Sequence, residues 1–225
     1  MLDKTSWKDL LAKARRGDAN AQNEVADHFY FGLKTTTNKI IVRQNLSSAF
    51  SWYKKAATNG IVVALTNLAD FLSEGKGCER DINKAVENYL LAIDKGSSRA
   101  ALNLGTIFRD KGNFKKAFKY YSLADKMDRA DYSFTVGLCY YYGIGVSIDK
   151  VIACKHFHKV SLDKLQTHTQ NEIDEANYIL GLSYLTGEVV KKSIDKSRVF
   201  LKLANADNDH KSAEQILFII GQSKH

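Results

Sequence analysis

Proline is absent from this 225-residue chain, where average usage would give about eleven. Because proline breaks helices and removes hydrogen bonds from strand ladders, a chain without it is expected to be regular throughout. Hydrophobic residues make up 44% of the sequence and charged residues 26%, which is ordinary globular composition and argues against disorder. We therefore expect a folded chain with few irregular segments.

Cysteine is scarce, and Cys78, Cys139 and Cys154 are too few and too widely spaced for a disulfide framework. This usage fits a reducing compartment. The opening sequence MLDKTSWKDLL contains acids and lacks the apolar core of a signal peptide. The longest apolar run near an end, Ile216 to Ile220, is far too short to span a bilayer. The sequence predicts a cytoplasmic protein without a membrane partner.

Acidic side chains are absent from residues 28–69, although this segment carries several lysines and an arginine. Elsewhere acids and bases are interspersed, and the net charge is +8. A basic balance speeds association with acidic partners. We therefore expect a protein partner that is acidic at its contact surface, with Lys34, Lys39 and Arg43 forming a secondary basic surface within an insertion at 33–45.

Five stretches of the chain share one pattern, in which an apolar anchor precedes a small residue and a large residue lies four positions after the anchor. The anchors are Val25, Leu68, Leu104, Val136 and Leu180. A second pattern follows each stretch: a small residue, then a ring or Leu four positions on, and usually Ala seven positions on. Its small residues are Ala49, Ala85, Ala117, Ala153 and Ser197. Both spacings place residues on one face of a helix.

Each unit is therefore predicted to be an antiparallel helix hairpin, in which small residues let two helices approach closely. Glycine follows four of the first helices, at Gly32, Gly75, Gly143 and Gly187, and is expected to end them in a left-handed conformation. Extended chain is expected only at Lys39 to Arg43, because three consecutive β-branched residues lie within it.

The predicted fold is all-α, a right-handed α-solenoid of five helix-hairpin repeats with N- and C-terminal capping helices. We expect a single domain over residues 1–225. Its caps are expected at 1–17 and 208–225, and its repeats at about 18–60, 61–96, 97–128, 129–174 and 175–207.

Two segments resemble a known family. The sequence AFSWYKKAA from Ala49 to Ala57 resembles the second helix of a Sel-one-like repeat, a relative of the tetratricopeptide repeat. The sequence LCYYYGIGV from Leu138 to Val146, with Asp149, resembles the loop between the two helices of that repeat. The resemblance covers roughly residues 18–207. It implies a protein-binding module, such as a signalling adaptor or a cytosolic neutraliser of a protein toxin.

Catalytic motifs are missing from the sequence, which has no phosphate-binding glycine loop, no HExxH, no GxSxG and no paired CxxC. We expect no enzyme activity, no catalytic residue, no cofactor and no small-molecule substrate. Cys154 and His158 lie four residues apart and could share a ligand, but structural zinc needs four ligands, so no metal is expected.

Nucleic acid is the partner class that the net charge alone would favour, since helical repeats can read RNA. The aromatic residues of this chain, however, lie mostly at internal anchor positions. Its basic residues do not recur at one repeat position, as a groove that follows a strand would require. A nucleic-acid partner is therefore not expected.

The concave face of such a stack is lined by the first helices. Counting from the anchors predicts the following partner-binding residues: Asn23, Asp27, Tyr30, Thr66, Asp70, Arg99, Thr106, Arg109, Phe134, Leu138, Tyr141, Tyr178, Leu182 and Leu185. The N-terminal half of this set is polar and the C-terminal half is apolar and aromatic. Two alternatives stay open: a closed stack or the C-terminal cap covers these residues, or the basic insertion makes the main contact.

Degenerate repeats and irregular insertions suit a surface shaped for one partner. The most specific hypothesis is a non-catalytic, immunity-type protein that binds and occludes a cognate bacterial toxin. The alternative is an adaptor or scaffold in signalling or complex assembly. The basic balance argues against a basic nuclease as the target.

Tyr141→Ala and Tyr178→Ala should each raise the dissociation rate of the natural partner, because aromatic anchors are commonly worth roughly 2 kcal/mol or more. Replacing Lys34, Lys39 and Arg43 by Ser should only slow association modestly and at low salt, because salt screens exposed charges. Surface plasmon resonance at two salt concentrations measures both rates. Normal binding by the tyrosine variants, with binding lost by the basic-surface variants at physiological salt, would contradict the groove assignment.

Overall fold

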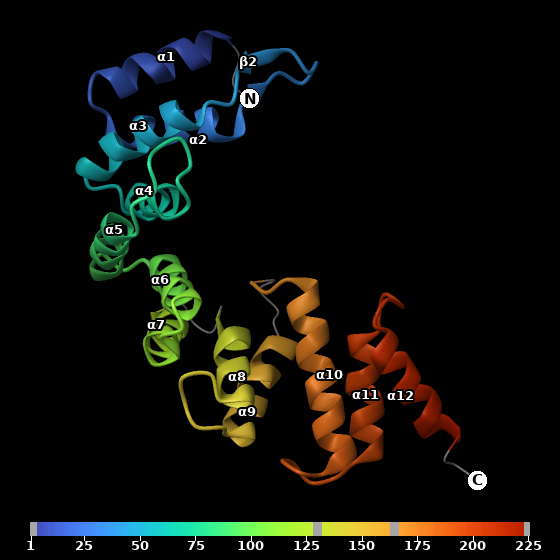
Figure 1. Cartoon of the computed structure of the whole chain (residues 1–225). Helices are drawn as coiled ribbons and strands as arrows, with labels where there is room; N and C mark the ends of the chain where they lie inside the picture. Colours follow the sequence, from blue (N-terminus) through green and yellow to red (C-terminus); the bar gives the residue numbers. More distant parts are fainter. Residues whose placement is uncertain (1–3, 128–131, 163–166, 223–225) are drawn as a thin grey trace. The chain divides into compact units, whose positions relative to one another are not determined.

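The computed structural model describes residues 4–127, 132–162 and 167–222 (Figure 1). The helices are α1 (Lys4–Arg15), α2 (Ala19–Phe31), α3 (Leu46–Thr58), α4 (Val62–Glu74), α5 (Ile82–Asp94), α6 (Ser98–Asp110), α7 (Phe114–Met127), α8 (Ser133–Tyr142), α9 (Lys150–Ser161), α10 (Gln170–Thr186), α11 (Ile194–Ala204) and α12 (Lys211–Gln222). The strands are β1 (Leu33–Lys34) and β2 (Ile40–Val42).

The described residues are 72% helical, and the predicted all-α solenoid class is confirmed. Strand β2 confirms the extended chain predicted within Lys39 to Arg43, but β1, which pairs with it antiparallel, shows that this was not the only extended segment. None of the described helices is both long and apolar enough to cross a membrane.

The chain divides into two compact units, residues 1–104 and residues 105–225, which we call unit 1 and unit 2. Helices α2 and α3, and then α4 and α5, pack as successive hairpins in unit 1, with α1 against α2. In unit 2, α8 packs on α9 and α10 on α11, and α12 packs on α11. The start of the predicted N-terminal cap and the predicted junction between repeats three and four lie partly outside the described residues.

Side-chain caps start several of these helices. Asp18, Asn45, Asp81, Asp149 and Ser193 each accept a hydrogen bond from a backbone N–H of the first turn. These bonds satisfy amides that have no partner within the helix. The starts of α2 and of the second helices α3, α5, α9 and α11 are therefore fixed by contacts within three residues.

Glycine ends α4, α8 and α10 in the predicted left-handed conformation, at Gly75, Gly143 and Gly187. The prediction is wrong for Gly32, whose φ is 76° but whose ψ is 162°. The chain leaves α2 at Gly32 in an extended direction because the insertion with β1 and β2 follows directly. Only glycine adopts that φ and ψ combination readily.

Small residues set the distance between the two helices of each hairpin. A Cβ added to Gly105 would lie 2.6 Å from the ring of Tyr121, and one added to Gly137 would lie 2.8 Å from the ring of Phe157. At the equivalent positions of unit 1, Ala26 and Ala69 are completely buried. The second-helix ring therefore lies directly against the first-helix backbone, and no larger side chain fits between them.

Each second helix buries a large residue four positions after its small residue: Tyr53, Tyr89, Tyr121, Phe157 and Leu201. Each first helix carries a matching residue two positions after its anchor: Asp27, Asp70, Thr106, Leu138 and Leu182. The tyrosine hydroxyl oxygens lie 2.5 Å from Asp27 Oδ1, 2.5 Å from Asp70 Oδ1 and 3.4 Å from Thr106 Oγ1. Where the buried residue has no hydroxyl, its partner is leucine.

Asp70 is half-buried, and burial raises its pKa. Hydrogen bonds from Tyr89 and Asn103 and the charge of Arg99 act in the opposite direction. Because the folded-state pKa stays above its usual value, the stability contributed by this group is fully present at low pH and is lost as the pH rises through that pKa. The Tyr89 hydroxyl limits that loss by stabilising the carboxylate.

Tyr89→Phe should lower the free energy of unfolding by about 1.5–3 kcal/mol at neutral pH, because it removes a hydrogen bond to a buried carboxylate. The cost should be smaller at acidic than at neutral pH, because the raised pKa of Asp70 favours its protonated form as the pH falls. The matched control Tyr121→Phe, whose hydroxyl meets only a neutral threonine, should cost about 0.5–1.5 kcal/mol with little pH dependence. Urea titrations at both pH values measure these energies. Equal, pH-independent costs for the two variants would contradict this account.

Candidate functional site

The first helices of unit 1 carry a set of polar residues that we call the first-helix face. Its members are Asn23, Asp27, Asn67, Asp70, Arg99 and Asn103. Asn23 and Asp27 are hydrogen-bonded within α2, and hydrogen bonds from α6 to α4 join Arg99 to Asn67 and Asn103 to Asp70. Four of them are predicted partner-binding residues. The spacing argument did not select Asn67 and Asn103.

On α2, Asn23 Nδ2 donates to Asp27 Oδ2 over 3.2 Å, and Tyr53 donates to the other oxygen of the same carboxylate. Asn23 Oδ1 is buried and accepts no hydrogen bond in the described part of the chain. This end of the face therefore has a fixed carboxylate and an amide oxygen that retains its full capacity to accept.

On α4 and α6, Arg99 is fixed from two sides. Its Nη2 donates to Asn67 Oδ1 and lies 3.9 Å from Asp70 Oδ2. The side chain nevertheless stays 48% exposed. Asn103 Nδ2 donates to Asp70 Oδ1 over 2.8 Å. The result is an exposed guanidinium whose orientation is set by its neighbours.

Two other predicted partner-binding residues of unit 1, Thr66 and Tyr30, differ in their exposure to solvent. Thr66 is only 1% exposed, and its hydroxyl bonds with Ser97 and with the Val62 carbonyl oxygen, so it supports the fold from inside. Tyr30 is half-buried, and its ring centroid lies 5.5 Å from that of Phe71 with Lys76 Nζ 5.8 Å away. Tyr30 can therefore extend the first-helix face, whereas Thr66 cannot without moving.

The predicted residues of unit 2 are mostly packed against its core. Phe134, Leu138 and Tyr141 are half-buried against a cluster that includes Phe157, and both aromatic rings lie 6.1 Å from the Phe157 ring. Arg109 is exposed and forms an ion pair with its neighbour Asp110 at 2.9 Å. The predicted Thr106 shares its hydrogen bond with Tyr121.

The C-terminal cap covers part of the predicted groove, as one of the two open alternatives allowed. Tyr178 and Leu185 pack against a cluster that includes Ala213 and Ile220 of α12. The Tyr178 ring centroid lies 4.6 Å from that of His210. Leu182 is half-buried on the same helix. Tyr178 therefore packs against the C-terminal cap and is only partly buried.

The predicted basic surface lies on and beside the β1–β2 hairpin. Lys34, Lys39 and Arg43 are exposed. The turn between the strands is held by Thr35, whose Oγ1 accepts from the Lys39 backbone N–H over 3.1 Å and shares a hydrogen bond with Thr37. The charges therefore stand on an ordered hairpin.

A serine, a histidine and an aspartate meet in unit 2, where the sequence motifs predicted no such cluster. Ser133 Oγ donates to Asp125 Oδ1 over 2.8 Å, while His156 Nδ1 lies 3.4 Å from that hydroxyl and 3.9 Å from the carboxylate. A catalytic triad places serine and aspartate on opposite ring nitrogens. Here both face the same nitrogen and Ser133 is completely buried, so the cluster joins three helices and lacks triad geometry.

The cysteines are free thiols, and burial raises the pKa of Cys139 to about 11 and that of Cys154 above its usual value. Buried protonated thiols are poor nucleophiles and poor metal ligands. Within the described residues, no group of three or more His, Cys, Asp or Glu side chains is arranged to hold a metal ion.

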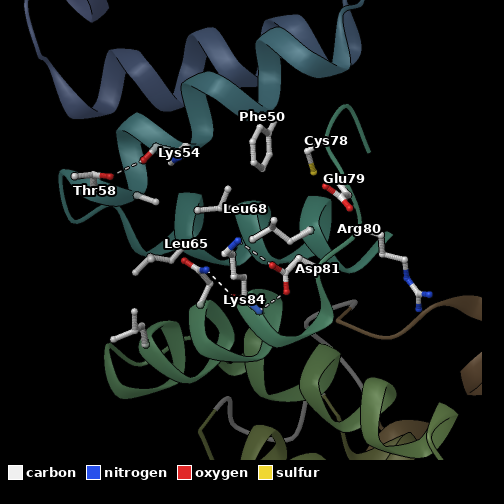
Figure 2. Close-up of a pocket in the computed structure, with 14 residues that line it drawn as sticks. Phe50, Lys54, Thr58, Leu65, Leu68, Cys78, Glu79, Arg80, Asp81 and Lys84 are labelled. Carbon is white, nitrogen blue, oxygen red and sulfur yellow. Dashed lines mark hydrogen bonds and ion pairs between the residues drawn. The ribbon is translucent and has the colours of Figure 1, made fainter. Parts of the chain in front are cut away.

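A groove of about 670 Å³ lies over α4 between α3 and α5 (Figure 2). Leu65 and Leu68 of α4 and Phe50 of α3 line it, as Figure 2 shows, and Leu72 also belongs to its lining. Lys54 lies on the α3 side, and Lys84 lies on the α5 side, where it is paired with Asp81 at 3.0 Å. The sequence analysis missed this groove.

Five segments of the chain match the model of the Sel1 repeat, at residues 19–61, 62–97, 98–124, 134–160 and 174–209. Among solved structures, a Sel1 repeat protein from Oxalobacter formigenes has a TM-score of 0.67 at 23% identity, covering 88% of this chain and 76% of that one. A protective antigen of uropathogenic Escherichia coli with an SLR fold has a TM-score of 0.61 at 22% identity, covering 98% of this chain and 52% of that one. These identities show the fold alone.

Two curated relatives match parts of the chain. A sel1-like repeat-containing protein of Acanthamoeba polyphaga mimivirus is 25% identical over 162 residues, and a DAP3-binding cell death enhancer of Rattus norvegicus is 28% identical over 153 residues. The matches cover 69% and 50% of this chain, but only 27% and 30% of those proteins. The five repeat matches span most of the sequence and show that the chain belongs to the Sel1 repeat family. Repeats of this family form protein-interaction scaffolds.

Proposed function

We propose that this chain is non-catalytic and binds one protein partner through the first-helix face of unit 1. The observation that carries the proposal is the fixed, half-exposed guanidinium of Arg99. All its contacts in the described part of the chain use Nη2, so Nη1 and Nε remain available to donate. These two N–H groups point in different directions, and each can donate a charge-assisted hydrogen bond to a carboxylate oxygen, which supports an acidic group at the contact.

The amides around Arg99 suit a polypeptide. Asn67 uses its oxygen for Arg99, leaving its NH₂ group to donate, and Asn103 uses its NH₂ group for Asp70, leaving its oxygen to accept. Backbone N–H and C=O groups of a bound segment require such alternating acceptors and donors. Because these side chains are already ordered, little conformational entropy is lost when they bind.

The specific role that we propose is occlusion of a protein toxin by an immunity-type protein in the cytosol. Free cysteines support a reducing compartment. The β1–β2 hairpin interrupts the repeat, and the 17-residue α10 is extended at its start by a capping box at Thr169. Such departures from a regular repeat support a surface made for one partner. The name of the rat relative describes binding to another protein, which also supports a protein partner.

Arg99→Ala should weaken binding to the natural partner by about 2 kcal/mol, or about 30-fold, because it removes an arginine anchor that is already oriented. The partner is first captured from native cells with the wild-type chain and identified by mass spectrometry. Its affinity for purified variants is then measured by calorimetry. The matched control is Arg15→Ala, at the exposed end of α1. Equal affinity for Arg99→Ala and wild type would rule out the first-helix face.

The same partner separates the two roles. A toxin, expressed alone, should stop growth, and co-expression of the wild-type chain should restore it, whereas Arg99→Ala should restore it less. A partner that binds through Arg99 but is harmless alone would overturn the toxin proposal and support an adaptor.

A further inference from the structure

We infer that the groove between α3 and α5 is a second docking site, which takes an aromatic side chain of a partner protein with a carboxylate beside it. This inference deepens the proposed function, because it assumes a protein partner and gives it a second point of contact. The groove lies entirely within unit 1 and is lined on three sides by α3, α4 and α5 (Figure 2).

The first observation is a pair of stacked rings that recurs in three hairpins. One ring lies four positions after the first-helix anchor, and the other lies three positions after the second-helix small residue. The centroid distances are 5.5 Å for Phe108 and Tyr120, 6.1 Å for Tyr140 and His156, and 5.5 Å for Tyr184 and Phe200. In the first hairpin the same positions hold Phe29 and Trp52, which pack against one apolar cluster. In these three hairpins a ring of the first helix therefore stacks on a ring of the second.

The second hairpin lacks both rings. Its equivalent residues are Leu72 and Asn88, and both line the groove. Asn88 does not replace the missing ring, because it is short and its Nδ2 donates over 2.8 Å to the Lys84 carbonyl oxygen of its own helix, while Leu72 is 7% exposed at the groove. The groove is therefore space that an aromatic pair fills in the other hairpins.

Phe50 provides the wall against which an incoming ring would pack. Its counterpart in the third hairpin is Phe118, which meets the Tyr140 ring of the next hairpin edge-on, with centroids 5.3 Å apart. Phe50 lies one position after its small residue, as Phe118 does, but it meets no aromatic ring among the described residues. An aromatic side chain from a partner would complete the arrangement, and such pairs contribute beyond the area that they bury.

Charge around the groove determines what should flank that ring. Lys84 is already paired with Asp81, and Glu79 and Arg80 contribute one charge of each sign from the loop between α4 and α5. Lys54 is exposed and forms no ion pair in the described part of the chain, and it lies within the acid-free segment 28–69. A carboxylate on the α3 side of the ring would therefore find an uncompensated cation. An aromatic residue next to Asp or Glu satisfies both features.

Asn88→Phe tests the site by placing the missing ring in the groove. The full-length chain is titrated with the peptide acetyl-Ser-Asp-Phe-Asp-Ser-amide while the methyl signals of Leu65, Leu68 and Leu72 are followed by NMR. These signals should shift and saturate with the wild-type chain, and affinity should fall at least about tenfold with Asn88→Phe. The matched control Asn83→Phe places the same ring on the same helix outside the groove and should bind as the wild type does.

Two further arms separate the ring from the charge. A peptide with Ala in place of Phe should leave the methyl signals unchanged. Lys54→Gln, an exposed substitution, should lower the affinity for the acidic peptide. It should not change the affinity for an otherwise equal peptide with Asn in place of Asp. Methyl signals that no aromatic peptide shifts, or equal affinity of wild type and Asn88→Phe, would overturn the docking site. Equal affinity of the acidic and Asn peptides for the wild-type chain would overturn the carboxylate.

These outcomes are independent of the test at Arg99. If no aromatic peptide binds in the groove, the expected effect of Arg99→Ala on affinity for the natural partner is unchanged. If Arg99→Ala keeps full affinity while Asn88→Phe lowers affinity for the same partner, the first-helix face fails and the groove stands.

Discussion

The direct contact between a second-helix ring and the backbone of the first helix is the constraint on which the rest of this structure depends. It requires a small residue opposite each ring, and Gly105 and Gly137 show how little space is left. Once the helices lie this close, the far end of the ring reaches the residue that directly follows the small residue on the first helix. The chemistry of that end then selects the residue that it meets, aspartate or threonine for a hydroxyl and leucine for a hydrocarbon. Packing inside each hairpin thereby determines whether its first helix presents a polar or an apolar surface.

This dependence explains the difference between the two units. In unit 1 the hydroxyls of Tyr53 and Tyr89 hold two carboxylates in place, and the second of these helps to orient Arg99. In unit 2, Phe157 and Leu201 offer no hydroxyl, so leucines and aromatic rings cover the equivalent positions and pack into the core. The two aspartates of the polar face are thus held from within the fold by buried phenols, and Asp70 in turn contacts Arg99 and Asn103.

Much of the fold was predictable from the sequence because helical spacing, small residues and glycine ends are local signals. The strand at Ile40–Val42 was predictable for the same reason. The candidate site was less predictable from the sequence. Counting from the anchors selected residues on the first helices but did not reveal the hydroxyls bound to Asp27 and Asp70. The pairing of Asp with Tyr, and of Leu with Phe or Leu, is nevertheless visible in the sequence. The cover that α12 places over Tyr178 depends on how a cap packs, which spacing does not encode. The groove could have been inferred from Leu72 and Asn88, since both depart from the aromatic pattern of the other repeats.

The Thr106–Tyr121 pair bears on how such repeats can diverge. Replacing Asp70 by leucine alone would leave a buried phenol without an acceptor, and replacing Tyr89 alone would leave a buried carboxylate with one donor fewer. Either single step from the polar version to the apolar one is therefore costly. Threonine carries both a hydroxyl and a methyl group, so it tolerates either a tyrosine or a phenylalanine opposite. A repeat with threonine at this position can change between a polar and an apolar first-helix surface by single substitutions. The third repeat, with Thr106 opposite Tyr121, is in this intermediate state.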